Sequence, residues 1–76
     1  MLKREKHKIP TFVKNALDEA GLTSAYKERP PYQQNDYIGW IIRAAREETK
    51  QKRLQQMLDE LKKGNVYMKM KWNRVK

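Results

Sequence analysis

Apolar residues recur at the three-to-four-residue spacing of an α-helix in three segments of the chain. The first segment covers residues 11–20. Pro10 suits its start, because the missing N–H of proline would have no partner in a first turn, and Gly21 suits its end. The second begins at about residue 33, and its pattern lapses near residue 46. Its apolar side chains are Tyr37, Ile38, Trp40, Ile41, Ile42, Ala44 and Ala45.

The third segment forms an i, i+3, i+4, i+7 stripe of Leu54, Met57, Leu58 and Leu61. Thr49 is a suitable N-cap for this helix, and Gly64 is expected to end it. Between the first two helices, residues 23–29 can hold one short helical turn with Tyr26 facing inward. Two prolines at 30 and 31 then prevent that turn from continuing.

After Gly64 the apolar pattern changes from a helical period to a period of two. One side would carry Val66, Met68, Met70 and Trp72, and the other Tyr67, Lys69 and Lys71. A single strand in a helical chain has no partner of its own. We therefore expect either an extended arm laid along the helices or a strand that pairs with another chain.

These patterns predict an all-α fold, a small three-helix bundle with an extended basic C-terminal arm. We divide the chain into a basic tail at residues 1–8, a helical domain at 9–64 and an extended basic and aromatic arm at 65–76. The expected core is Phe12, Val13, Leu17, Ile38, Ile41, Leu54, Leu58 and Leu61.

The net charge of the 76-residue chain is +9, and its placement adds to this picture. Residues 1–8 have four basic side chains against one acidic, and residues 62–76 have six basic side chains and no acid. Residues 9–61 are neutral, with eight of each sign. Basic ends attract polyanions such as nucleic acid, although basic segments also serve solubility alone.

Several classes of protein are excluded or disfavoured by composition. The absence of cysteine removes disulfide scaffolds and thiolate metal sites and is compatible with a reducing compartment. No apolar run reaches the roughly 18 residues of a membrane span, and no signal-peptide core is visible, so we expect a cytoplasmic protein. Phosphate loops, nucleophile elbows and metal-ligand spacings are all missing, so we expect no enzymatic activity, cofactor or metal.

Two groups of residues are candidates for an interaction surface. The first lies at the start of the third helix, where Arg46, Lys50 and Arg53 would share a face; Glu48 and Thr49 lie among them. A solvated helix start with ordinary capping and ion pairs explains this group equally well. The second group mixes aromatic rings and cations in the arm. The full candidate set is Arg46, Glu48, Thr49, Lys50, Arg53, Tyr67, Lys69, Lys71 and Trp72.

The stretch from residue 30 to residue 72 resembles the YdeI/OmpD-associated family, also called the bacteriocin-protection family. The residues that carry the resemblance are Tyr37, Trp40, Ile41 and Ala44, followed by Arg46, Glu48, Thr49, Lys50 and Arg53. They are similar to the family's tyrosine, tryptophan and alanine helix and its basic, glutamate-threonine-basic segment. Family members commonly place proline just before the glutamate-threonine pair, where this chain has Glu47.

The resemblance implies a bacterial protein linked with tolerance of bacteriocins or other antimicrobial peptides, and it implies no reaction. Our first hypothesis is a non-enzymatic interaction module with a protein partner and no strong salt dependence. The alternative is nucleic-acid binding through the basic ends and the helix start at Lys50 to Arg53, with an affinity that falls steeply with salt. A third hypothesis is binding of the arm to an anionic membrane.

Overall fold

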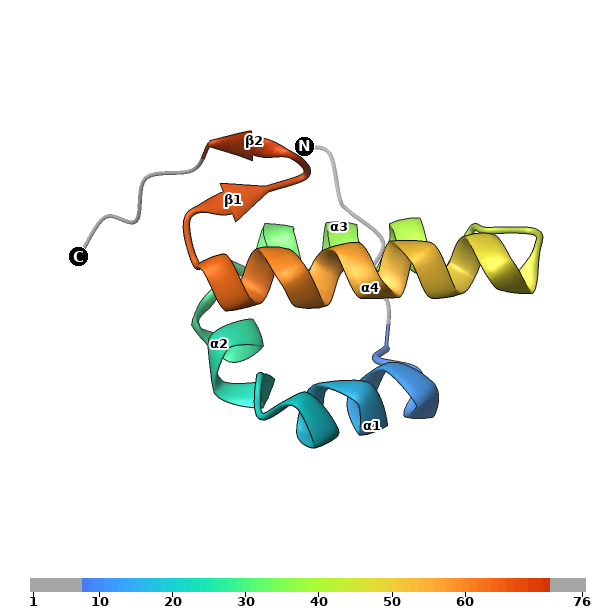
Figure 1. Ribbon diagram of the computed structural model, residues 1–76, viewed down its shortest axis with the longest axis horizontal. Coiled ribbons are helices and arrows are strands. Elements are labelled where there is room, and N and C mark those ends of the chain that lie inside the picture. Colours follow the sequence, from blue (N-terminus) through green and yellow to red (C-terminus); the bar gives the residue numbers. More distant parts are fainter. Residues whose placement is uncertain (1–7, 72–76) are drawn as a thin grey trace, which may run out of the picture.

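The computed structural model describes residues 8–71 as four helices followed by a two-stranded hairpin. The elements are α1 (Thr11–Ala20), α2 (Thr23–Glu28), α3 (Pro31–Ile42), α4 (Glu47–Lys63), β1 (Val66–Tyr67) and β2 (Met70–Lys71). α4 contacts α1, α2, α3 and β1 and is the central element of the fold. Figure 1 shows α4 running across the molecule, with α1 and α2 on one side and the hairpin on the other.

The first helix has the bounds that its apolar spacing predicts, and its end follows from Gly21. Gly21 takes the left-handed conformation (φ 69°), which a residue without Cβ adopts at little cost. Its N–H donates to the carbonyl of Asp18 (3.2 Å), and the N–H of Leu22 donates to the carbonyl of Leu17 (2.9 Å). These two bonds form a Schellman motif. Gly64 ends α4 in the same conformation (φ 82°), and its N–H donates to the carbonyl of Glu60 (2.9 Å).

The short turn expected at residues 23–29 is a six-residue helix, so the described part of the chain has four helices rather than three main ones alone. Tyr26 points inward from it and is 3% exposed. Pro31 occupies the first turn of α3, where proline is well tolerated. The side chain of Gln34 donates to the carbonyls of Lys27 (3.2 Å) and Arg29 (2.7 Å), which holds the end of α2 against α3.

The prediction that Thr49 caps the third main helix is wrong. The N-cap of α4 is Arg46, three residues earlier, with no side-chain cap bond, and Thr49 lies inside the first turn. Glu47 and Glu48 occupy that turn, where carboxylates interact favourably with the positive end of the helix dipole. The break between α3 and α4 spans residues 43–46, and it forms with Glu47 rather than proline before Glu48 and Thr49.

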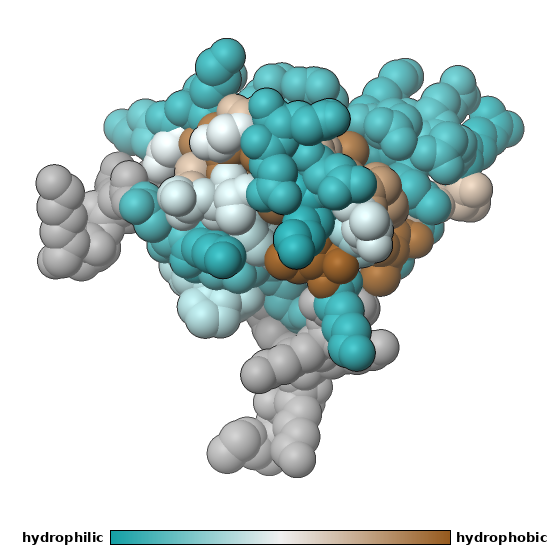
Figure 2. Space-filling model, turned by 90° about the horizontal axis from the view of Figure 1, so that it is seen from below, coloured by the Kyte–Doolittle hydropathy of each residue, from teal (hydrophilic) through white to brown (hydrophobic). Residues whose placement is uncertain are grey.

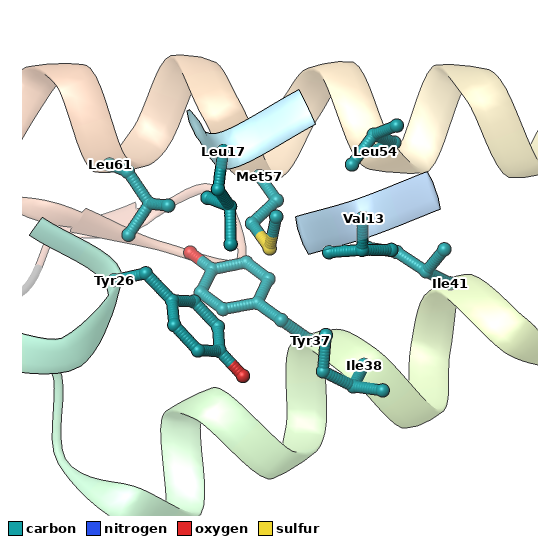
Figure 3. Close-up of a cluster of buried hydrophobic side chains, with 9 residues drawn as sticks. All are labelled: Val13, Leu17, Tyr26, Tyr37, Ile38, Ile41, Leu54, Met57 and Leu61. Carbon is teal, nitrogen blue, oxygen red and sulfur yellow. The ribbon is translucent and has the colours of Figure 1, made fainter. Parts of the chain in front are cut away.

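The core lies where α1, α2, α3 and α4 meet, and it contains most of the expected residues (Figure 3). Tyr37 and Met57 are fully buried at its centre, and Phe12 and Leu58 pack against it while partly exposed. The core is thin, and some large apolar side chains remain at the surface: Ile9 and Ile42 are each 40% exposed. On the side of α1 and α2, apolar side chains are visible between hydrophilic ones (Figure 2). The buried hydrophobic cluster is Val13, Leu17, Tyr26, Tyr37, Ile38, Ile41, Leu54, Met57 and Leu61.

The single extended segment expected after Gly64 is not observed. The described part of it folds back on itself as an antiparallel hairpin, in which Val66 pairs with Lys71 and Tyr67 with Met70. The turn residues Met68 and Lys69 both have positive φ (50° and 65°), as a type I′ hairpin turn requires. The expectation that Met68 and Met70 lie on the same side is also wrong, because Met70 is 60% exposed while Met68 packs against the core.

Candidate functional site

The candidate residues at the start of α4 remain in one region, but two of its cations contact aromatic rings. Lys50 Nζ lies 5.8 Å from the centroid of the Phe12 ring on α1, and the Arg53 guanidinium lies 5.3 Å from that of the Trp40 ring on α3. Arg53 Nη1 also donates to the carbonyl of Trp40 (2.6 Å). Cation–π contacts of this kind contribute about 0.5–2 kcal/mol. Lys50 and Arg53 therefore tie α4 to its neighbours.

The other charged candidates in this region form a weak surface pair. Arg46 Nη1 lies 3.7 Å from Glu48 Oε1, and the two side chains are 80% and 72% exposed. An ion pair this exposed contributes less than about 1 kcal/mol. Packing and a surface ion pair thus explain the positions of Arg46, Glu48, Lys50 and Arg53. The common basic face expected for three of them is not maintained, because Arg46 is exposed to solvent while Lys50 and Arg53 lie against aromatic rings.

The hairpin residues lie toward the other end of α4, whose 17 residues correspond to a length of about 25 Å. Tyr67 anchors the hairpin: its hydroxyl donates to Asp36 Oδ2 (2.6 Å). Its ring meets those of Tyr37 (5.5 Å, 88°) and Tyr32 (6.0 Å, 81°) edge to face. Lys69 and Lys71 are exposed, and Trp72 lies outside the described residues. The candidate set is therefore two separate groups.

A buried carboxylate that we did not single out from the sequence holds the hairpin in place. Glu60 on α4 is 4% exposed, and its Oε1 accepts hydrogen bonds from the Tyr37 hydroxyl and from the N–H of Met68 (2.7 Å). Its Oε2 accepts from the N–H of Lys69 (2.9 Å) and from Gln56 Nε2 (3.0 Å). Successive backbone N–H groups in a turn form a natural cradle for an anion, and here the anion is a side chain of the same chain.

The positive φ angles of the turn explain why this carboxylate matters. A residue with a Cβ loses roughly 1–2 kcal/mol in the left-handed region, and both Met68 and Lys69 are in it. Hydrogen bonds to a charged acceptor contribute about 1.5–3 kcal/mol each, which is enough to offset that cost. Glu60 thus stabilises a turn whose own residues do not favour it. Its helical position could have revealed it, because Met57, Glu60 and Leu61 lie at i, i+3 and i+4 on the buried stripe.

A second buried polar group, Arg29 at the C-cap of α2, contacts the same helix. Arg29 is 4% exposed, and its Nη2 donates to the carbonyl of Glu60 (3.0 Å) while its Nη1 donates to Gln33 Oε1 (3.0 Å). Gln33 Nε2 in turn donates to the Tyr32 hydroxyl (3.1 Å). Among the described residues, every buried side-chain nitrogen and oxygen has a hydrogen-bond partner. The buried polar groups are therefore fully used in holding α2, α3 and α4 together.

Burial in the core raises the pKa values of two tyrosines, Tyr26 and Tyr37. Burial raises the pKa of Tyr26 to about 12 from the ordinary value of 10.0. Burial also raises the pKa of Tyr37, and the bond to the Glu60 carboxylate raises it further, because an ionised phenol would lose that bond and face a negative charge. Both phenols are neutral in the folded protein at ordinary pH.

Four exposed lysines lie on the last turn of α4 and on the hairpin that follows it. We call Lys62, Lys63, Lys69 and Lys71 the lysine cluster. No acidic residue occurs between residues 61 and 71, and the hairpin that carries two of the lysines is fixed to α4 through Glu60. The sequence interpretation counted Lys62 and Lys63 only among the six basic side chains of residues 62–76. The hairpin that joins them to Lys69 and Lys71 was not visible in the alternating pattern.

The chemistry open to this arrangement is the binding of anionic groups. Within residues 8–71 no group of three or more histidine, cysteine or acidic side chains is placed to hold a metal ion. The same part of the chain has no helix that is both long and apolar enough to cross a membrane. Exposed ammonium groups, by contrast, attract phosphates and carboxylates without further machinery.

Comparison with known proteins yields a match over the part of the chain that contains the helices. No curated protein and no solved structure matches the chain at the level required for a significant match. The family model described as bacteriocin-protection, YdeI or OmpD-associated matches residues 6–64, which include all four helices. The chain therefore belongs to the bacteriocin-protection family of YdeI or OmpD-associated proteins.

Proposed function

We propose that the protein is a non-catalytic binding module that engages an anionic partner through the lysine cluster. The observation that carries the proposal is the attachment of the hairpin turn to Glu60, because it fixes Lys69 and Lys71 on the same end of α4 as Lys62 and Lys63. Cations held in a defined arrangement lose less conformational entropy on binding than cations on a mobile segment. The family description connects this module with protection against bacteriocins.

The buried polar groups support a binding role rather than a reaction. A general acid or base needs access to a substrate, whereas the Glu60 carboxylate is 4% exposed and accepts four hydrogen bonds from within the fold. Tyr37, whose hydroxyl donates to this carboxylate, is fully buried. Each of these groups is occupied in positioning the hairpin.

The sign of the charge favours an anionic partner over direct capture of a cationic antimicrobial peptide. A chain with a net charge of +9 repels such peptides at long range and attracts anionic surfaces. The family membership favours a protein partner, and an acidic protein surface and a nucleic acid share the chemistry that the lysine cluster recognises. In either case we expect the affinity to fall as the salt concentration rises. This differs from the first hypothesis from the sequence, in which binding of a protein partner has no strong salt dependence.

The test compares two charge-reversal variants of the whole chain. Lys69→Glu with Lys71→Glu reverses half of the lysine cluster, and Lys14→Glu with Lys27→Glu makes the same change of charge at exposed lysines on α1 and α2. Fluorescence anisotropy follows binding to labelled single-stranded RNA, duplex DNA and an acidic glutamate-rich peptide. We expect the cluster variant to lose about tenfold or more in affinity for at least one probe, and the control to change by less than about threefold. Equal losses in both variants would refute a localised site.

A further inference from the structure

An exposed tyrosine at the start of α3 is held in place by buried groups. Tyr32 is 44% exposed, yet its hydroxyl accepts a hydrogen bond from Gln33 Nε2 (3.1 Å). Gln33 is itself fully buried and is fixed by the bond from Arg29 Nη1 to its Oε1 (3.0 Å). A surface ring ordinarily has rotational freedom to lose on binding. Here an interior network orients the ring before any partner arrives, which lowers the entropy cost of contacting it.

This ring lies beside the hairpin. The rings of Tyr32 and Tyr67 meet edge to face, with centroids 6.0 Å apart. Tyr67 pairs across the hairpin with Met70, which is 60% exposed and stands between Lys69 and Lys71 in the chain. The surface therefore combines an oriented aromatic ring, an exposed thioether and the cations of the lysine cluster.

We propose that this surface binds single-stranded nucleic acid, with a base stacked on Tyr32 and the phosphates held by the lysine cluster. Aromatic rings beside a cationic track are the combination that binds single strands, because every unpaired base has a π-face to stack. The bases of a duplex are already stacked on one another and leave the ring without a partner. The inference rests on the proposed function and specifies its anionic partner.

The hairpin geometry argues against the main alternative, insertion into an anionic membrane. An inserting hairpin projects an apolar tip, whereas the tip residues Met68 and Lys69 here donate their N–H groups to Glu60 and lie against α4. Met68 packs on the core rather than outward. Only Met70 remains as an exposed apolar side chain in the described hairpin.

The test measures anisotropy of a labelled uridine-rich RNA 12-mer and of a duplex with the same label. Tyr32→Ala removes the ring, Tyr32→Phe keeps it, and Ile42→Ala removes another exposed side chain of α3, 40% exposed, as a control. We expect Tyr32→Ala to weaken binding of the single strand by about 5- to 100-fold. Tyr32→Phe keeps the ring but loses the hydrogen bond that orients it, so it is expected to weaken binding less than Tyr32→Ala does. Ile42→Ala is expected to stay within about threefold of the original chain, and duplex affinity is expected to be unaffected by Tyr32→Ala.

Photocrosslinking keeps the inference falsifiable where Tyr32→Ala fails to fold. The unaltered protein is irradiated with a 4-thiouridine-containing RNA, and the crosslinked peptides are mapped. Crosslinks at Tyr32 or in residues 66–71 support the proposal, and crosslinks confined to other parts of the chain overturn it.

Equal affinity for single strand and duplex with no effect of Tyr32→Ala overturns the inference and leaves the proposed function standing. Lysine-dependent binding of anionic vesicles or acidic peptide, without binding of RNA, also overturns the inference and leaves the proposed function standing. If the lysine cluster affects no probe at all, both proposals fail.

Discussion

Replacing Glu60 by glutamine tests how the hairpin is held. The substitution keeps the size of the side chain and exchanges one carboxylate oxygen for an NH₂ group, which donates rather than accepts. One oxygen of Glu60 accepts from the N–H of Met68 and the other from the N–H of Lys69. Whichever way the amide is oriented, its nitrogen therefore meets one of these two donors.

The expected loss of stability follows from these contacts. A buried donor without an acceptor costs about 1–3 kcal/mol, and the remaining bonds fall from the strength of charged pairs to that of neutral ones. We expect Glu60→Gln to lower the free energy of unfolding by about 2–4 kcal/mol, which corresponds to a decrease in Tm of about 10 °C or more for a domain of this size. Such a loss is a large share of the roughly 5–15 kcal/mol that stabilises a native protein.

The matched control is the neighbouring acid. Asp59→Asn makes the same change of charge one residue earlier, at an exposed side chain whose described contact is a bond from Gln55 (3.2 Å). Surface changes of this kind stay within about 0.5 kcal/mol. Urea denaturation followed by circular dichroism compares the two variants, and hydrogen exchange reports on the amides of Met68 and Lys69, which we expect to exchange faster in Glu60→Gln. Equal stability of the two variants, with unchanged exchange at both amides, would refute the role assigned to Glu60.

Three further predictions concern the turn, the tyrosines and α4. Lys69→Gly is expected to raise the free energy of unfolding by up to about 1 kcal/mol in urea denaturation, because glycine accepts the φ of 65° without strain; a loss of stability would contradict this. The raised pKa values of Tyr26 (about 12) and Tyr37 mean that the stability from their neutral burial is fully present below pH 10 and is lost as pH rises through the folded pKa values. We therefore expect cooperative unfolding by base above pH 10, seen as tyrosinate absorbance and loss of helical circular dichroism together; tyrosine ionisation complete near pH 10 in the folded protein would contradict it. Arg53→Ala is expected to cost about 1–2 kcal/mol, because it removes a backbone hydrogen bond and a cation–π contact, whereas the exposed neighbour Lys52→Ala serves as a control with little effect on thermal stability.

The helices could be predicted from the sequence because their signals are local. Gly21 and Gly64 end α1 and α4 in the left-handed conformation, as glycine after an apolar stripe indicates. The start of α4 was missed because the capping preference of Thr49 competes with the preference of two glutamates for the first turn, and the glutamates prevail.

The hairpin could not be predicted because its turn has no local signal. Two-residue hairpin turns are recognised by glycine, asparagine or aspartate, and this one has Met68 and Lys69. Their conformation is stabilised by Glu60, eight and nine residues earlier on another element. An alternating pattern shows which residues favour an extended backbone, but it cannot show that a distant carboxylate reverses the chain.

Only part of the candidate site could be predicted, because contacts between residues distant in the sequence place the rest. Lys69 and Lys71 were chosen because they lie in a basic and aromatic segment, and the structure places both at the surface. Arg53 was chosen for its charge and is partly buried against Trp40, which no charge pattern indicates. Tyr32 was overlooked because two prolines before it and a polar stretch after it suggest a loop, whereas it lies in the first turn of a helix whose buried glutamine orients its ring.

The most direct test of the binding account is the salt dependence of RNA affinity, measured between about 50 and 200 mM salt. For a single strand, the slope of log affinity against log salt changes by about 0.7 for each phosphate neutralised. Replacing Lys69 and Lys71 by glutamine is therefore predicted to reduce the steepness of the slope by about 1.4, while the same replacement at Lys14 and Lys27 leaves it unchanged. A slope that is the same in the original chain and both variants would contradict the assignment of phosphate contacts to the lysine cluster.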